Sequence, residues 1–265
     1  MSKALLPVLV ALLPAVASAV GATTGAAILV PQFAPGQTHS NVFSIMHSIK
    51  ADGYDEYARR NGGSADYTVL AADAHVWRVR SAWRYDGQSG GIDESELRDG
   101  GRTACTLKAD AHMACQAYLD GSGLVYNPTL WGDAPAQLRA GQSWQVAVTP
   151  AWELGGPNGT EQVTVVSVDP AAGSAVLMRE GRSTGAFGEG EPQQRQLTRN
   201  GQTETLDITP GTAHWKGYTT FVRGVIFSDE LLVTRDATLK ATDGHTVKAT
   251  ERWIMLLNAA PFPTN

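Results

Sequence analysis

Apolar and polar residues alternate along much of this chain, and the pattern is clearest between His75 and Tyr85. There, one set of alternate positions carries Trp77, Val79, Ser81, Trp83 and Tyr85, and the other carries Arg78, Arg80, Ala82 and Arg84. A period of two with one apolar face is typical of a half-buried β-strand. We therefore expect the aromatic face to pack in the core and the arginines to face water.

Similar strand-like runs recur through the rest of the sequence, at residues 67–70, 143–148, 162–168, 175–180, 194–198, 203–208, 219–228, 230–240 and 246–257. Eight Asn-Gly or Asp-Gly pairs lie between and around the runs, and such pairs supply the positive φ angles of tight hairpin turns. Only residues 54–60 and 133–138 suggest a turn of helix. The pattern predicts an all-β, antiparallel protein with very little helix.

The strand-like runs continue without a separate linker, which favours one β domain over residues 39–265. Its two halves meet in the loop-like segment 127–141. We expect a barrel-like or strongly curved sheet, with a β-sandwich as the alternative. Residues 20–38 are rich in Gly, Ala, Thr and Pro and are expected to form an extended N-terminal arm.

The first 19 residues have the three parts of a secretory signal peptide. Lys3 is followed by an apolar run to Ala17, and Ala17-Ser18-Ala19 places small residues where a signal peptidase cuts. The run is too short to span a bilayer, so we expect no transmembrane segment after cleavage. No Cys follows the cleavage point, so the protein is not expected to be a lipoprotein. We expect a periplasmic or secreted protein.

Cys105 and Cys115 are the only two cysteines. In an oxidising compartment such a pair is usually a disulfide. A hairpin centred on Asp110 would place the two residues directly opposite each other, within reach of a bridge. The spacing is not Cys-x-x-Cys, which argues against a redox-active pair.

Charge and histidine spacing exclude several classes of partner. The formal net charge is −5, and charges of both signs are scattered without a basic block, so nucleic acid is not an expected partner. None of the six histidines is spaced two, three or four residues from another, so the chain has no local metal-ligand motif. We expect no metal and no cofactor.

Two segments, 87–91 and 181–185, match the Gly-x-Ser-x-Gly pattern of hydrolase nucleophiles. That motif works at a strand-to-helix turn, and neither match leads into a helix-like segment. Paired carboxylates near strands, including Glu153 and Glu180, leave glycoside hydrolysis open. Because no catalytic residue is identified, an enzyme is not the favoured interpretation.

The tryptophans suggest a binding function instead. Trp131 and Trp215 follow loop-like segments and are candidates for a cavity rim, together with Trp152 and Glu153. We expect a non-enzymatic protein that binds an apolar or amphipathic small molecule, or an envelope protein, on a curved sheet. A periplasmic or secreted glycoside or ester hydrolase remains the alternative. The strands lack a consistent lipid-facing band, which disfavours an outer-membrane barrel.

Overall fold

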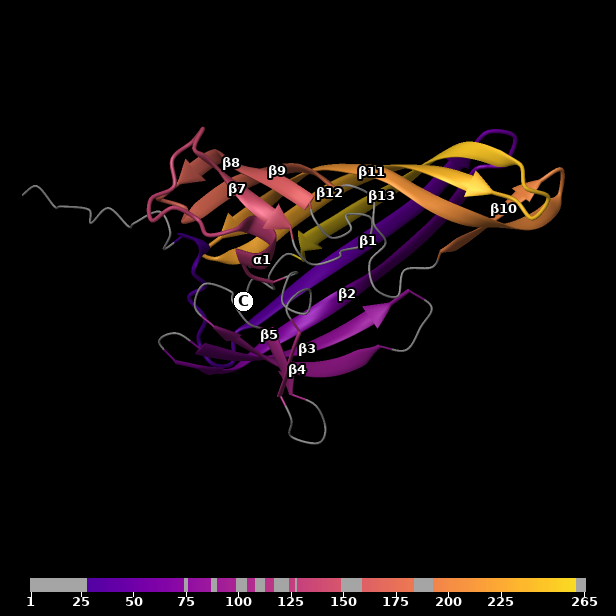
Figure 1. Ribbon diagram of the computed structural model, residues 1–265. Helices are drawn as coiled ribbons and strands as arrows, with labels where there is room; N and C mark the ends of the chain where they lie inside the picture. Colours follow the sequence, from indigo (N-terminus) through magenta and orange to yellow (C-terminus); the bar gives the residue numbers. More distant parts are fainter. Residues whose placement is uncertain are drawn as a thin grey trace, which may run out of the picture.

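The computed structural model describes residues 28–73, 76–86, 90–98, 104–107, 113–116, 124–126, 128–148, 159–183 and 193–260. Within them, one short helix accompanies a single antiparallel sheet (Figure 1). The elements are β1 (Thr38–Ala51), β2 (Tyr57–Ala72), β3 (Val76–Tyr85), β4 (Gly91–Arg98), β5 (Ala104–Leu107), β6 (Met113–Gln116), α1 (Pro128–Trp131), β7 (Ser143–Val148), β8 (Gly159–Asp169), β9 (Ser174–Ser183), β10 (Gln194–Arg199), β11 (Gln202–Val222), β12 (Val225–Lys240) and β13 (Thr246–Ala259).

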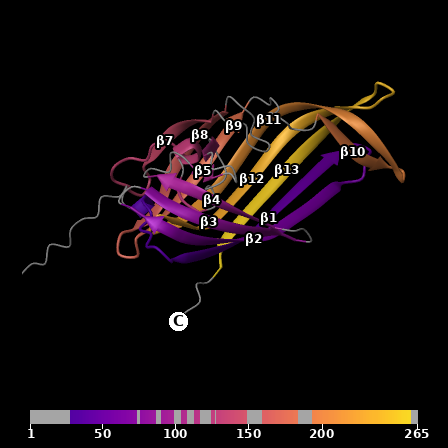
Figure 2. The same cartoon turned by 90° about the horizontal axis from the view of Figure 1, so that it is seen from below.

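The sheet follows the order β6-β5-β4-β3-β2-β1-β13-β12-β11-β9-β8-β7, and β10 pairs with β11 outside this path. Among the described residues, the two ends of the path do not pair with each other. The sheet bends so that β2, β3 and β4 lie opposite β7, β8 and β9, with α1 on the concave side (Figures 1 and 2). The predicted curved antiparallel sheet is confirmed, and the β-sandwich alternative is wrong because all the described strands belong to one sheet.

Alternation along the strands separates the concave face from the convex face. On β11 the residues from Ala213 to Thr219 alternate strictly between buried and exposed. The concave side of one end of the sheet is filled by α1 and by residues 28–33 and 124–126. Trp131, Val163, Leu177 and Phe221 are fully buried there. The last part of the predicted N-terminal arm thus belongs to the core, since Ile28 and Leu29 are both buried.

The opposite end has its own apolar core. Ile49, Leu206 and Leu239 are buried there, on β1, β11 and β12, and Leu197 of β10 joins them. A third buried cluster lies between these two, where Ala213 and Trp215 of β11 pack with Leu231 and Val233 of β12, and Trp253 and Met255 of β13 pack against it while staying partly exposed. A fourth buried cluster contains Trp77 and Val79 of β3.

Two local expectations are wrong. Residues 54–60 do not form a helical turn but lead into β2, and Asn61-Gly62 lies inside that strand rather than in a hairpin turn. The glycines are needed there for space, because a Cβ on Gly63 would lie 2.5 Å from Cζ of Phe43. Residues 133–138 are not helical either.

The helix begins earlier, at Pro128, whose fixed φ suits a first helical position. It ends at Trp131, and the next residue, Gly132, has a φ of 71° and donates its N–H to the Pro128 carbonyl at 2.8 Å. Among the described residues, no helix has the length and apolar character needed to cross a bilayer.

Candidate functional site

The middle of the concave face carries an apolar surface that is only partly buried. It lies on β1, β3 and β13, and we call it the central apolar surface: Phe43, Ile45, Trp83, Tyr85, Met255 and Leu257. Ile45 pairs directly with Met255, and Phe43 pairs with Leu257. The side chain of Tyr85 is 41% exposed although it points to the concave face.

Small residues on β2 allow the aromatic rings of this surface to meet. Gly63 stands between Phe43 and Tyr85 in the cross-strand register. The Phe43 and Tyr85 rings consequently meet edge to face, with centroids 5.5 Å apart. Trp83 and Tyr85 are 5.3 Å apart in a similar arrangement. Side chains in mutual contact form a continuous apolar surface, whereas scattered exposed apolar residues are ordinary on proteins.

A buried ion cluster borders this surface toward β10. Glu251 and Arg235 are both fully buried, and Arg235 donates to Glu251 Oε2 from Nε at 2.9 Å and from Nη2 at 2.5 Å. Arg195 Nε donates to Glu251 Oε1 at 2.6 Å. His47 lies beside the same oxygen, with its Nε2 atom 3.5 Å away, and stacks on Trp253.

The environment of Glu251 strongly favours its ionised form. Burial alone would raise its pKa, but hydrogen bonding to His47 and the charges of Arg235 and Arg195 outweigh that effect and lower the pKa to about 2. The cluster therefore consists of one carboxylate held between two guanidinium groups. The cluster links β10, β12 and β13 through these hydrogen bonds.

A second polar network lies on the other side, where β8, β9 and β11 meet. Trp215 Nε1 donates to Glu161 Oε2 at 2.5 Å. Arg179 pairs with Asp229 at 3.2 Å, and Thr219 donates to the other oxygen of Asp229 at 2.7 Å. Trp131 Nε1 donates to the Thr219 hydroxyl at 3.2 Å, which links α1 to the network.

Glycines explain how Trp215 reaches Glu161. A Cβ added to Gly159 would lie 2.9 Å from the indole of Trp215, and a Cβ on Gly181 would overlap the same ring. The indole therefore lies against the bare backbone of β8 and β9. Burial raises the pKa of Glu161, and the nearby charge of Arg179 and the indole hydrogen bond oppose that rise only in part.

The residues singled out from the sequence fall in different places. Trp131 and Trp215 do not lie at a rim: they are 0% and 2% exposed and take part in the same polar network. The expectation of a rim failed because it rested on the neighbouring loops, while the side chains point inward from α1 and β11. Trp152 and Glu153 lie outside the described residues.

Of the hydrolase candidates, only Ser183 and Glu180 lie in the described part of the chain, and they point to opposite faces of β9. Ser183 is the last residue of β9 and is buried, and the residues that follow it lie outside the described part. Glu180 is exposed, on the face of β9 opposite to Ser183, and its Oε2 atom lies 3.5 Å from Nζ of Lys216 on β11. Ser89 lies outside the described residues. In the described part of the chain, no group of three His, Cys, Asp or Glu residues could hold a metal ion.

The predicted pairing of the cysteines is confirmed at the level of the backbone. Cys105 on β5 lies directly opposite Cys115 on β6. The positions of the two side chains are not described, so the disulfide itself stays a prediction.

Another polar cluster ties three hairpin turns together at the end near β10. His245 contacts Asp243 through Nδ1 at 2.5 Å and the Tyr54 hydroxyl through Nε2 at 3.2 Å. The Tyr54 hydroxyl donates to Glu204 at 2.6 Å, and the Arg199 guanidinium lies over the Tyr54 ring. Every partner comes from a turn or a strand end, so the cluster explains how these turns are held together.

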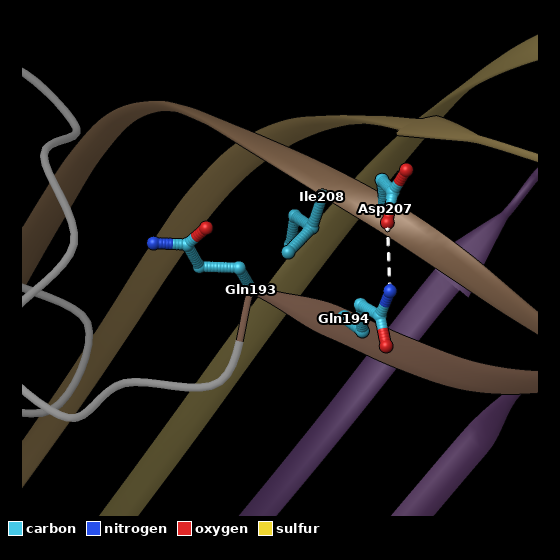
Figure 3. Close-up of a pocket in the computed structure, with 4 residues that line it drawn as sticks. All are labelled: Gln193, Gln194, Asp207 and Ile208. Atoms are coloured by element: carbon cyan, nitrogen blue, oxygen red, sulfur yellow. Dashed lines mark hydrogen bonds between the residues drawn. The ribbon is translucent and has the colours of Figure 1, made fainter.

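A hollow of about 650 Å³ opens beside β10 and β11 (Figure 3). Gln193, Gln194, Asp207 and Ile208 line it, and Gln194 donates to Asp207 at 2.9 Å. Among the described residues, the lining combines the amide and carboxylate groups of Gln193, Gln194 and Asp207 with the aliphatic side chain of Ile208.

Sequence reasoning missed Glu161, Arg179, Arg235 and Glu251. Each of the four has at least one apolar, buried neighbour two residues away on its strand, such as Val163 for Glu161 and Leu177 for Arg179. A charged residue at a strand position where the alternation otherwise places apolar residues is therefore the feature of the sequence that could have revealed them.

Comparison with known proteins yields no family. No family model matches the chain, and no curated protein matches it. A structure of lipovitellin, described for its lipid–protein interactions, is 10% identical with a TM-score of 0.37 over 88% of this chain. This chain spans about a quarter of the lipovitellin chain, with 26% covered.

Two further structures are still less similar. A mutant of the Rh. blastica porin is 7% identical, with a TM-score of 0.24, covering 84% of this chain and 100% of the porin. A hot dog fold protein of unknown function from Alicyclobacillus acidocaldarius is 8% identical, with a TM-score of 0.14, covering 86% and 81%. At these scores none of the similarities carries an argument about function.

Proposed function

We propose that the protein binds an apolar or amphipathic small molecule against the central apolar surface of its curved sheet. The observation that carries the proposal is a set of six apolar side chains, in mutual contact or cross-strand register, that stay partly exposed beside the buried clusters of the concave face. A contiguous exposed apolar surface on a concave face is the usual form of a ligand site.

The convex face also exposes apolar side chains, including Val42, Met46 and Leu232. Met46, Ile254 and Leu232 form one cross-strand row there, the next row places Ser44 and Glu230 on either side of Leu256, and the sheet curves away from both rows. The concave face instead brings its apolar side chains toward one another, so a ligand contacts several strands at once. This difference makes the concave face the better site.

The test uses N-phenyl-1-naphthylamine, an uncharged probe whose fluorescence rises in apolar surroundings. Ile45→Lys places a charge on the central apolar surface, and we expect it to weaken probe binding at least tenfold, or about 1.4 kcal/mol. Met46→Lys is the matched control, since Met46 is the next residue of β1 and lies 38% exposed on the convex face. It should change the affinity less than twofold.

Equal losses in the two variants would contradict the proposal, and so would a larger loss in Met46→Lys. Failure of the wild-type chain to bind the probe would contradict it directly. Circular dichroism of both variants separates lost binding from lost folding.

We also propose that the chain works outside the cytoplasm, in the periplasm or as a secreted protein, on the basis of the signal-like residues 1–19. Expression in a bacterial host followed by mass spectrometry tests this. The expected product begins at Val20 and is found outside the cytoplasm. A cytoplasmic product that retains Lys3 would contradict the proposal.

A further inference from the structure

Two buried polar atoms at the edge of the concave face have no hydrogen-bond partner: Oε1 of Glu161 and Nε of Arg179. The two residues are 3% and 5% exposed. The other ends of both groups are engaged, because Glu161 Oε2 accepts from Trp215 and Arg179 Nη2 donates to Asp229. One acceptor and one donor are thus buried without a partner, which costs free energy in a folded protein.

The two groups are close neighbours on the concave face. Glu161 on β8 lies opposite Gly181 on β9, and Arg179 stands two residues from Gly181 on the same face. Such diagonal neighbours are about 7–8 Å apart, within reach of long side chains. The charge of Arg179 indeed acts on the Glu161 carboxyl.

The pair also lies in the same cross-strand row as the central apolar surface, with the buried Leu231 between them. A single cross-strand row joins Ile45 on β1, Met255 on β13, Leu231 on β12, Gly217 on β11 and Arg179 on β9. Four interstrand spacings of about 4.8 Å make this row about 19 Å long. One end of the row is apolar and the other end carries the unpaired donor and acceptor.

We propose that Glu161 and Arg179 bind the polar end of the ligand whose apolar part lies on the central apolar surface, and that this end is an uncharged hydroxyl group. The inference rests on the proposed function. A hydroxyl supplies what both atoms lack: its O–H donates to Glu161 Oε1, and its oxygen accepts from Arg179 Nε. The ligand is therefore an alcohol-type amphiphile rather than a fatty acid.

Charge argues against an anionic headgroup. The guanidinium of Arg179 already pairs with Asp229, and a second carboxyl, that of Glu161, faces it. An added anion would meet two acidic side chains and one cation that is already neutralised. Burial further disfavours an uncompensated charge at this position.

Three probes of matched chain length test the headgroup by displacement of N-phenyl-1-naphthylamine: dodecanol, methoxyundecane and dodecanoate. Methoxyundecane has the size of dodecanol but cannot donate. We expect the wild-type chain to bind dodecanol about tenfold more tightly than either other probe, which corresponds to about 1.4 kcal/mol. Glu161→Gln keeps an oxygen that accepts the hydrogen bond from Trp215, but it replaces the unpartnered oxygen Oε1 by an amide nitrogen, which donates. In this variant the preference for dodecanol over methoxyundecane should therefore fall to about twofold or less.

Arg179→Lys provides a second variant that retains the positive charge beside Asp229 and removes the Nε donor. It should also reduce the preference for dodecanol. Binding of methoxyundecane reports whether each variant is folded, because that probe depends mainly on the central apolar surface. Equal wild-type affinity for the three probes, or tightest binding of dodecanoate, would overturn the hydroxyl assignment alone. Failure of all three to bind would overturn the proposed function as well.

Discussion

Replacing Glu251 by Gln probes the buried ion cluster through its dependence on pH. The substitution preserves shape and removes the charge that Arg235 and Arg195 share. Because Arg235 is fully buried, its guanidinium would lose its counter-charge inside the protein. Breaking a buried pair in this way typically costs about 3–5 kcal/mol, so we expect a loss of that size at pH 7.

The pH dependence follows from the lowered pKa of Glu251. The ordinary value is 4.5 and the folded value is about 2. At about 1.36 kcal/mol per pH unit, the ionised carboxylate stabilises the folded state by about 3 kcal/mol at pH 7. This contribution is present above the unfolded pKa and is lost as the pH falls toward the folded pKa. At pH 3 about 1.4 kcal/mol of it remains.

Urea unfolding of the wild type and Glu251→Gln at pH 7 and pH 3 measures the effect. The difference in the free energy of unfolding should shrink by about 2 kcal/mol between the two pH values. Glu230→Gln, the same exchange at an exposed position of β12, should stay within about 0.5 kcal/mol of wild type at pH 7. A difference between wild type and Glu251→Gln that is unchanged at pH 3 would refute the reasoning.

Three further predictions concern the second network and the cysteines. Trp215→Phe removes the donor to Glu161 and should lower the free energy of unfolding by about 1–3 kcal/mol in urea titration. Gly181→Ala introduces a Cβ that overlaps the Trp215 ring, and it should cost about 1–3 kcal/mol and alter the near-ultraviolet circular dichroism of the tryptophans. A disulfide between Cys105 and Cys115 should appear as a mass increase of about 2 Da on reduction. Its reduction should lower the free energy of unfolding by about 2–3 kcal/mol. An unchanged mass together with an unchanged free energy of unfolding would exclude the disulfide.

Local patterns predicted much of the sheet. The alternation along residues 76–85 placed Trp77 and Val79 in the core, and both are buried. The symmetry of the short hairpin placed Cys105 opposite Cys115, which the register confirms. These predictions succeeded because side-chain alternation and hairpin register depend on neighbouring residues along the chain.

The same alternation could not reveal which inward side chains stay uncovered. Tyr85 lies in phase with Trp77, yet one is 41% exposed and the other 4%. Trp77 packs in a buried cluster with Leu124 and against Phe33, which lies more than forty residues earlier in the sequence, whereas the aromatic contacts of Tyr85 among the described residues are with Phe43 and Trp83. Burial of an inward position is thus decided by tertiary packing.

The ion cluster shows the other limit of the sequence. Arg195, Arg235 and Glu251 are spread over three strands, and their meeting depends on how β10, β12 and β13 are placed across the sheet. Each charge can be recognised as out of phase with its strand, but its partner cannot be named without the strand order. The candidate site depends on such placements throughout, and the sequence alone did not locate it.

Photolabelling tests the central claim most directly, because it reports where an apolar molecule rests on the protein. The full chain is incubated with an alkyl diazirine alcohol, irradiated, digested and mapped by mass spectrometry. We predict labels on Phe43, Ile45 and Met255, with competition by unlabelled dodecanol. Labels confined to the convex positions Val42, Met46 and Leu256, or labels that dodecanol does not reduce, would contradict a ligand site on the concave face.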